Sequence, residues 1–142
     1  VQKEVAHRIC SQPGSKDYGI LSVAAGLLSK AKIEFDISPS CFYPKPKVVS
    51  TIIEIQFDVD NKNEIDFNPI MKLVKASFGQ RRKVLKNSLK DYLLKNFDNR
   101  SNEIFQKAEE NSIDYFAKRA EELSVKDFII FYNFLEKFKK EY

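Results

Sequence analysis

Residues 40–50 (SCFYPKPKVVS) hold the side chains best suited to chemistry. Prolines fix the backbone φ, so this stretch is a stiff loop on which an aromatic ring is held as a rigid face. Such a face can stack on a nucleobase, and lysines beside it can meet phosphates. The residues concerned are Phe42, Pro44, Lys45, Pro46 and Lys47. The pattern equally allows a second interpretation, in which Phe42 is a core residue and the prolines only join two strands.

Positive charge is concentrated in the middle of the chain. The net charge is only +4, but residues 69–100 carry nine Lys or Arg and two acidic residues, whereas residues 101–142 carry seven basic and nine acidic ones. A local basic stripe indicates a polyanion partner, although a solvated helix face is the alternative. The triplet Arg81-Arg82-Lys83 favours nucleic acid, because a guanidinium matches phosphate oxygens in a bidentate manner.

The elements that position these residues fall into two groups. Before residue 58 we predict two helices, a strand with one buried face, a proline-rich loop, and a β-branched strand buried on both faces. Their ranges are 3–11, Ile20–Lys30, Ile33–Ile37, Ser38–Lys47 and Val48–Phe57. In the second helix, we expect Leu21, Ala24, Ala25 and Leu28 to line one face. This pattern predicts that residues 1–58 form the carboxyl-terminal part of an α/β sheet domain. They contain too few strands to make the whole sheet.

Residues 59–68 are polar and predict a linker, and residues 69–142 predict a small helical domain. Asn68 is its expected first cap, followed by Pro69 at the first helical position. A stripe of Leu85, Leu89 and Leu93 extends the helical pattern beyond Arg81, and Ser101 is expected to cap a helix ending at Glu110. The last helix has the clearest start, a capping box of Ser124 and Asp127 with Leu123 as its staple. Its expected buried face is Phe128, Phe131, Tyr132, Leu135 and Phe138.

Composition excludes several classes of protein. With 43% hydrophobic and 31% charged residues, the chain is globular, and no apolar run is long enough to cross a bilayer. Two cysteines make neither a disulfide framework nor a metal site, so we expect the reducing cytoplasm. A His7–Cys10 nucleophile lacks an orienting third residue. The pairs Glu109-Glu110 and Glu121-Glu122 are interpreted as solvated helix faces.

The chain opens with Val1, and its only methionine is Met71. We therefore interpret the sequence as the carboxyl-terminal piece of a longer protein.

Five segments of the chain form a recognisable series of motifs. They are Gln2–Ile9 (QKEVAHRI), Pro13–Val23 (PGSKDYGILSV), Phe42–Ser50 (FYPKPKVVS), Phe78–Leu89 (FGQRRKVLKNSL) and Arg119–Ser124 (RAEELS). In this order they resemble motifs of the rRNA adenine N6-dimethyltransferases, and most closely the small-subunit branch, the KsgA family. The macrolide-resistance methylases share the Phe-x-Pro-x-Pro element but match the other segments less well.

The resemblance implies an S-adenosylmethionine-dependent enzyme with a Rossmann-like catalytic domain and a helical carboxyl-terminal domain. It would dimethylate two adjacent adenosines near the 3′ end of 16S rRNA during small-subunit biogenesis. By the same resemblance, Phe42 packs on the extruded adenine, and Lys83 and Arg119 lie on the rRNA-binding face. To that face we add Arg81, Arg82 and Lys86.

The family's glycine-rich cofactor loop and its Asn-Leu-Pro-Tyr catalytic motif are not among these residues. We therefore expect this chain alone to bind neither S-adenosylmethionine nor metal and to be inactive. The full-length enzyme is expected to be a monomer, whereas the fragment is expected to be able to self-associate. The alternative is a non-catalytic RNA- or ribosome-binding module of the same fold.

Overall fold

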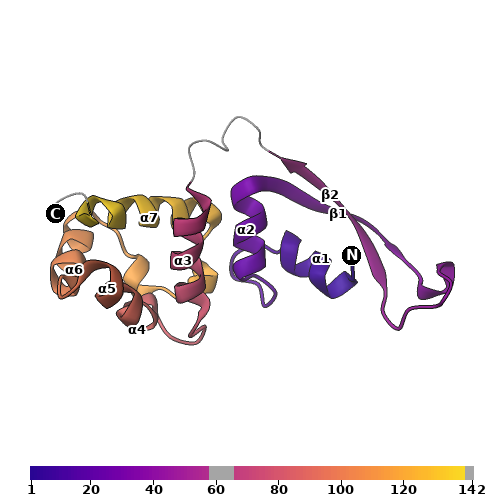
Figure 1. The fold of residues 1–142 in the computed structure, drawn as a ribbon, viewed down its shortest axis with the longest axis horizontal. Coiled ribbons are helices and arrows are strands. Elements are labelled where there is room, and N and C mark those ends of the chain that lie inside the picture. The colour runs from indigo at the N-terminus through magenta and orange to yellow at the C-terminus, as the bar shows by residue number, and fades with distance from the viewer. Residues whose placement is uncertain (58–65, 140–142) are drawn as a thin grey trace. The chain divides into compact units, whose positions relative to one another are not determined.

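The computed structural model describes residues 1–57 and 66–139, and the chain divides into two compact units, 1–65 and 66–142 (Figure 1). Most of the predicted linker, residues 59–65, lies outside the described residues. Its last two residues, Phe67 and Asn68, are already helical, because α3 (Phe67–Phe78) begins one residue before the predicted cap. We call residues 1–57 the ribbon unit and residues 66–139 the helical unit.

The ribbon unit is built on two antiparallel strands. β1 (Ser29–Ile37) pairs with β2 (Ser50–Phe57), with an irregular register between Ile33 and Phe35. Helices α1 (Lys3–Cys10) and α2 (Ile20–Leu28) contact each other and the strands, and Figure 1 shows both on the same side of the ribbon. The core of the unit is small. Its buried residues are Ala6, Tyr18, Ser22, Val23, Leu27, Ser29 and Thr51.

The first residues of the chain lie along the outer edge of β2. The Lys3 N–H donates to the Val49 carbonyl at 3.0 Å, and the Thr51 N–H donates to the Val1 carbonyl at 2.7 Å. Beyond Thr51, the outer edge of β2 has no partner strand in the described part of the chain.

Both predicted strands form, but within the described residues their apolar side chains are not covered. Ile33 and Phe35 of β1 are 39% and 58% exposed, and Ile55 and Phe57 of β2 are 42% and 57% exposed. A two-stranded ribbon leaves most of its surface open. The apolar pattern is typical of a strand covered by further layers, which the described residues do not supply.

The residues predicted to line one face of α2 are not the ones that the fold buries. Ser22, Val23 and Leu27 are buried, whereas Leu21 is 42% exposed. The helix is apolar over most of its length (ILSVAAGLL), so its periodicity does not select one face.

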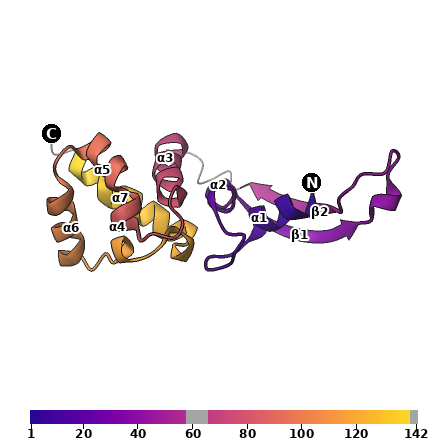
Figure 2. The same ribbon diagram turned by 90° about the horizontal axis from the view of Figure 1, so that it is seen from below.

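The helical unit contains four further helices and two short 3₁₀ turns besides α3. They are α4 (Leu85–Ser88), α5 (Lys90–Phe97), α6 (Ser101–Glu110), η2 (Tyr115–Ala117), η3 (Ala120–Glu122) and α7 (Val125–Lys139). Helix α7 contacts both α3 and α5 (Figure 2). Of the face predicted for α7, Tyr132 is half-buried and the other four residues are buried. The predicted leucine stripe is buried too, although a turn after α3 interrupts the helix.

The predicted capping box of α7 is confirmed. The Ser124 N–H donates to the Asp127 carboxylate at 3.0 Å, and the Asp127 N–H donates to the Ser124 hydroxyl at 3.1 Å. Burial alone would raise the pKa of Asp127, but the hydrogen bonds from Ser124 and Tyr115 outweigh it and lower that pKa. The resulting stability is present above the carboxyl's usual pKa and is lost as the pH falls through its lowered folded-state value.

We expect Ser124→Ala to lower the free energy of unfolding by about 1 kcal/mol, because the N-cap acceptor is removed. Ser101→Ala is the matched control, since Ser101 is the first helical residue of α6 and Arg100 precedes the helix as its cap. The control should change stability little. Urea denaturation followed by circular dichroism measures both variants, and equal losses would contradict the capping argument.

Candidate nucleic-acid interface

The loop between the two strands presents aromatic side chains to solvent. Pro39–Cys41 form a short 3₁₀ turn, whose start is capped by the Ser38 hydroxyl, which accepts from the Ser40 N–H at 3.3 Å. The Phe42 N–H closes this turn by donating to the Pro39 carbonyl at 3.2 Å. The Tyr43–Pro44 peptide bond that follows is cis. Figure 2 shows the loop projecting beyond the ends of β1 and β2.

Phe42 is 41% exposed, so the second interpretation, Phe42 as a core residue, does not hold for the described residues. Tyr43, for which the sequence predicts no role, is fully exposed. Lys45 and Lys47 are exposed beside them, and the intervening proline is half-buried. The loop therefore offers two aromatic rings and two ammonium groups, which suits a single-stranded nucleic acid.

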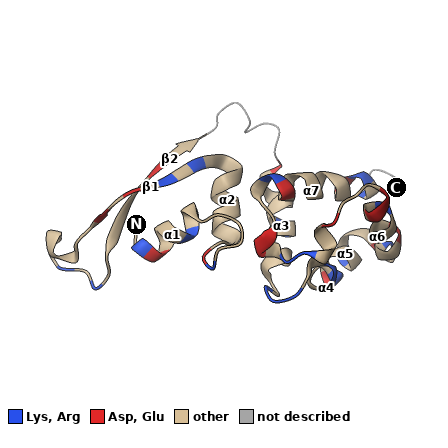
Figure 3. Cartoon of the chain, turned by 180° about the vertical axis from the view of Figure 1, so that it is seen from behind, with Lys and Arg blue, Asp and Glu red and all other residues tan. Residues whose placement is uncertain are grey.

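Arg81, Arg82 and Lys83 lie in a turn between α3 and α4, which we call the basic turn; Figure 3 shows it as the blue loop joining these helices. The prediction of one helix through residue 86 is wrong here. Helix α3 ends at Phe78, and the Lys83 N–H donates to the Gln80 carbonyl at 2.9 Å. Arg82 and Lys86 are therefore not neighbours on one helix face.

A second segment lies against the basic turn. Val84 and Arg119 form an isolated antiparallel bridge, and the Leu85 N–H donates to the Lys118 carbonyl at 2.8 Å. These backbone contacts bring Arg119 beside the residues that follow Lys83, although the two are far apart in sequence.

The cations of this region differ in how they are held. Arg81 pairs with Glu121 at 3.2 Å and its guanidinium lies 5.9 Å from the centre of the Phe78 ring. Arg82, Lys83 and Arg119 are exposed and form no side-chain ion pair within residues 1–57 and 66–139. Three cations are thus available to an external anion, and Arg81 is engaged by the fold.

A family model of ribosomal RNA adenine dimethylases matches residues 1–136. The chain belongs to this family. The family membership predicted from the five motif segments is therefore confirmed.

Proteins of the family from several bacteria are similar to this chain. Ribosomal RNA small subunit methyltransferase A of Wolbachia pipientis wMel is 38% identical over 135 residues, which cover 95% of this chain and 44% of that protein. The protein of the same name from Thermotoga petrophila is 36% identical over 132 residues, covering 93% of this chain and 44% of the relative. The chain spans less than half the length of these two relatives.

The fold is similar to that of a dimethyladenosine transferase from Plasmodium falciparum. Its crystal structure matches with a TM-score of 0.80 at 24% identity, over 98% of this chain and 55% of that one. This likeness confirms the mixed fold class, in which helices accompany a small sheet.

Burial or a structural partner accounts for several of the other candidate groups of this family member. Burial raises the pKa of the Cys10 thiol, which disfavours the thiolate that a nucleophile needs. Glu110 pairs with Lys107 at 3.2 Å, and the Glu122 carboxylate accepts from the Arg119 N–H at 2.7 Å. Among the described residues, no three His, Cys, Asp or Glu side chains are grouped to hold a metal ion, and no helix has the length and apolarity to cross a membrane.

Proposed function

We propose that this chain is part of an S-adenosylmethionine-dependent enzyme that dimethylates N6 of two adjacent adenosines near the 3′ end of 16S rRNA. The observation that carries the proposal is the exposed Phe42 on its proline loop in a chain of the ribosomal RNA adenine dimethylase family. The enzyme would act on the small ribosomal subunit during its assembly, in the cytoplasm, as a monomer.

The chemistry of the loop supports this proposal. The lone pair of adenine N6 is delocalised into the ring, and the base must leave its stack before an enzyme can reach it. Phe42 offers a ring face on which the extruded base can pack, and Pro44 and Pro46 limit the movement of that face. Lys45 and Lys47 are exposed on the same loop, and we propose that they hold the phosphates that flank the base.

The edge of β2 supports the proposed place of this chain in a larger sheet domain. Val1 and Lys3 already bond to that edge, in the antiparallel direction. A strand continuing from them would pair with the rest of β2, and further layers of the larger domain would cover the exposed Ile55 and Phe57. Residues 1–58 are thus proposed to complete a Rossmann-like domain, and residues 69–142 to form a separate rRNA-binding domain. Without those further strands, the same apolar surface would favour self-association.

The residues of this chain do not fit an S-adenosylmethionine site. Its four glycines, at positions 14, 19, 26 and 79, make no Gly-x-Gly-x-Gly loop. No glycine stands between positions 26 and 79, so neither β1 nor β2 is followed by a glycine-rich segment. We therefore derive no step through the cofactor, and we propose that other residues of the whole protein bind it.

We expect Phe42→Ala to lower kcat/KM for methyl transfer to small-subunit RNA by about 5- to 150-fold, because base–aromatic stacking is worth about 1–3 kcal/mol. The assay follows labelled methyl groups from S-adenosylmethionine into RNA, using the whole protein. Phe42→Trp keeps a flat ring and is expected to retain activity. Both variants should unfold at the parent's urea midpoint, since the side chain is exposed.

Parental activity in Phe42→Ala would remove the ring from the proposed mechanism. Absence of methyl transfer by the parent protein, with RNA binding intact, would instead favour the non-catalytic RNA-binding module.

A further inference from the structure

A pocket of about 790 Å³ opens in the helical unit next to the basic turn. Phe105 and Phe116 form its aromatic wall, with ring centres 4.8 Å apart and planes at 82°. This volume lies within the range of small-molecule sites, about 300–1,000 Å³. Val84 and Lys86 also line the pocket, so one wall continues directly from the basic turn.

The C-terminus of α6 shapes another wall. The Ser112 N–H donates to the Glu109 carbonyl at 3.1 Å, and the Ile113 N–H donates to the Ala108 carbonyl at 2.8 Å. The φ of Ser112 is 58°, in the left-handed region. Together with the two hydrogen bonds, this conformation makes the helix end a Schellman motif. This end turns Ile113 back beside Ala108, and both line the pocket.

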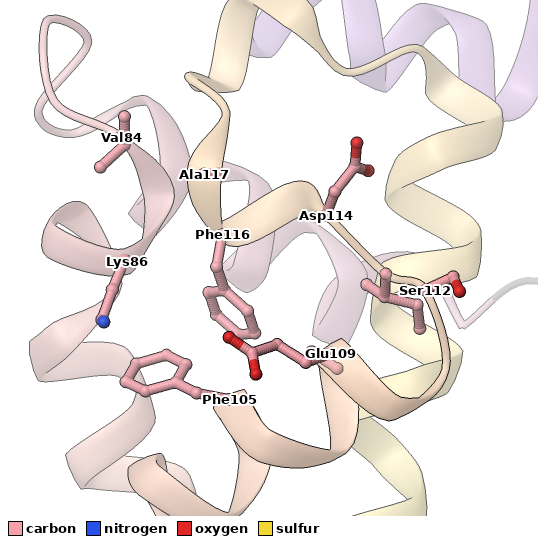
Figure 4. A pocket seen from close by; sticks show the side chains of 10 residues that line it. Val84, Lys86, Phe105, Glu109, Ser112, Asp114, Phe116 and Ala117 are labelled. Atoms are coloured by element: carbon pink, nitrogen blue, oxygen red, sulfur yellow. The ribbon is translucent and has the colours of Figure 1, made fainter.

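Two side chains of opposite charge flank the Phe105 ring. The Lys86 ammonium lies 5.1 Å from the ring centre. Figure 4 shows the Glu109 carboxylate pointing toward Phe105 and Phe116. Glu109 is exposed and forms no ion pair in the described part of the chain, whereas Asp114 at the same pocket pairs with Lys118 at 3.6 Å. The pocket thus combines an apolar wall with an acceptor at Glu109 and a donor at Lys86.

We propose that this pocket binds an unpaired guanine base of an RNA strand whose phosphates lie on Arg82, Lys83 and Arg119. The inference rests on the proposed function, because it takes RNA as the partner. Guanine carries two neighbouring donors, N1–H and the N2 amino group, on its Watson–Crick edge, and a carboxylate such as Glu109 can accept from both. Its O6 and N7 acceptors suit the Lys86 ammonium.

The other bases fit the same groups less well. Adenine and cytosine place a ring acceptor beside their amino group, where it would face the carboxylate. Uracil offers one N–H between two carbonyl groups. Stacking on an aromatic side chain is common to all bases, so Glu109 rather than Phe105 is the source of selectivity.

The test measures binding of short single-stranded oligoribonucleotides that differ at one unpaired base: guanine, hypoxanthine or adenine. Hypoxanthine lacks the N2 amino group, so we expect its affinity to be about tenfold lower than that of guanine. Glu109→Gln should remove this preference. Glu110→Gln, the neighbouring substitution on the same helix outside the pocket, should keep it.

The outcomes separate this inference from the function on which it rests. Salt-dependent binding that is equal for all three bases would overturn the guanine site and leave RNA binding intact. A preference for guanine that survives Glu109→Gln would overturn the assignment of the carboxylate. Absence of binding to any oligonucleotide at low salt would overturn both proposals.

Discussion

Phe131→Ala is expected to lower the free energy of unfolding of the helical unit by about 3–5 kcal/mol. The Phe131 side chain is fully buried on α7. Its ring centre lies 5.1 Å from that of Phe116, nearly edge to face, and 5.4 Å from that of Tyr115. Truncation would leave a cavity between these rings and remove favourable aromatic contacts.

Ile130→Ala is the matched control, because Ile130 is the preceding residue of the same helix and is 41% exposed. Its loss should be much smaller, since less apolar area leaves the core. Urea denaturation followed by far-ultraviolet circular dichroism measures both. If Phe131→Ala prevents folding altogether, Phe131→Leu, which removes less volume, should fold with an intermediate stability. Equal losses in Phe131→Ala and Ile130→Ala would contradict the described core.

The helical core could be predicted from the sequence because its signals are local. Ser124 and Asp127 stand three residues apart, and their side chains reach each other's backbone N–H within one turn. The leucine stripe is likewise predicted correctly, since Leu85, Leu89 and Leu93 are all buried, although Leu89 lies between α4 and α5. Periodicity reports which residues turn inward, but it is less informative about where a helix stops.

The basic turn could not be predicted, because its conformation depends on a distant segment. Residues 79–84 continue the helical spacing of α3, yet the chain leaves the helix and Val84 bridges to Arg119. A contact between segments 35 residues apart leaves no trace in local spacing. The family resemblance alone placed Arg119 near the other cations.

In the ribbon unit the strands are predicted correctly, but their apolar residues are more exposed than the pattern alone indicates. The β-branched pattern of β2 correctly predicts a strand, but its apolar residues are typical of a strand with more neighbours than β1, α1 and α2.

The proposed guanine pocket could not be predicted from the sequence for another reason. Its walls come from α4, α6 and the residues around η2, which are separate in the sequence. The sequence also does not distinguish Glu109, which lines the pocket, from Glu110, which does not.

Under the proposed function, the double variant Lys83→Ala, Arg119→Ala is expected to bind small-subunit RNA more weakly and with a flatter salt dependence. Each lost phosphate contact releases about one fewer counterion, so the slope of log affinity against log salt should fall by about two units in total. Both side chains are exposed and form no ion pair within residues 1–57 and 66–139, so the urea midpoint should hardly change.

Lys95→Ala, Lys137→Ala is the matched control, because it removes the same charge from two exposed lysines of the helical unit outside the basic turn. If phosphates contact Lys83 and Arg119 directly, the control should retain most of the parent's salt slope, since charges beyond a Debye length are largely screened at about 0.1 M salt. Equal slopes in the two double variants would mean that net charge alone attracts the RNA. If the first variant fails to fold, Lys83 and Arg119 instead stabilise the contact between Val84 and the segment that contains Arg119.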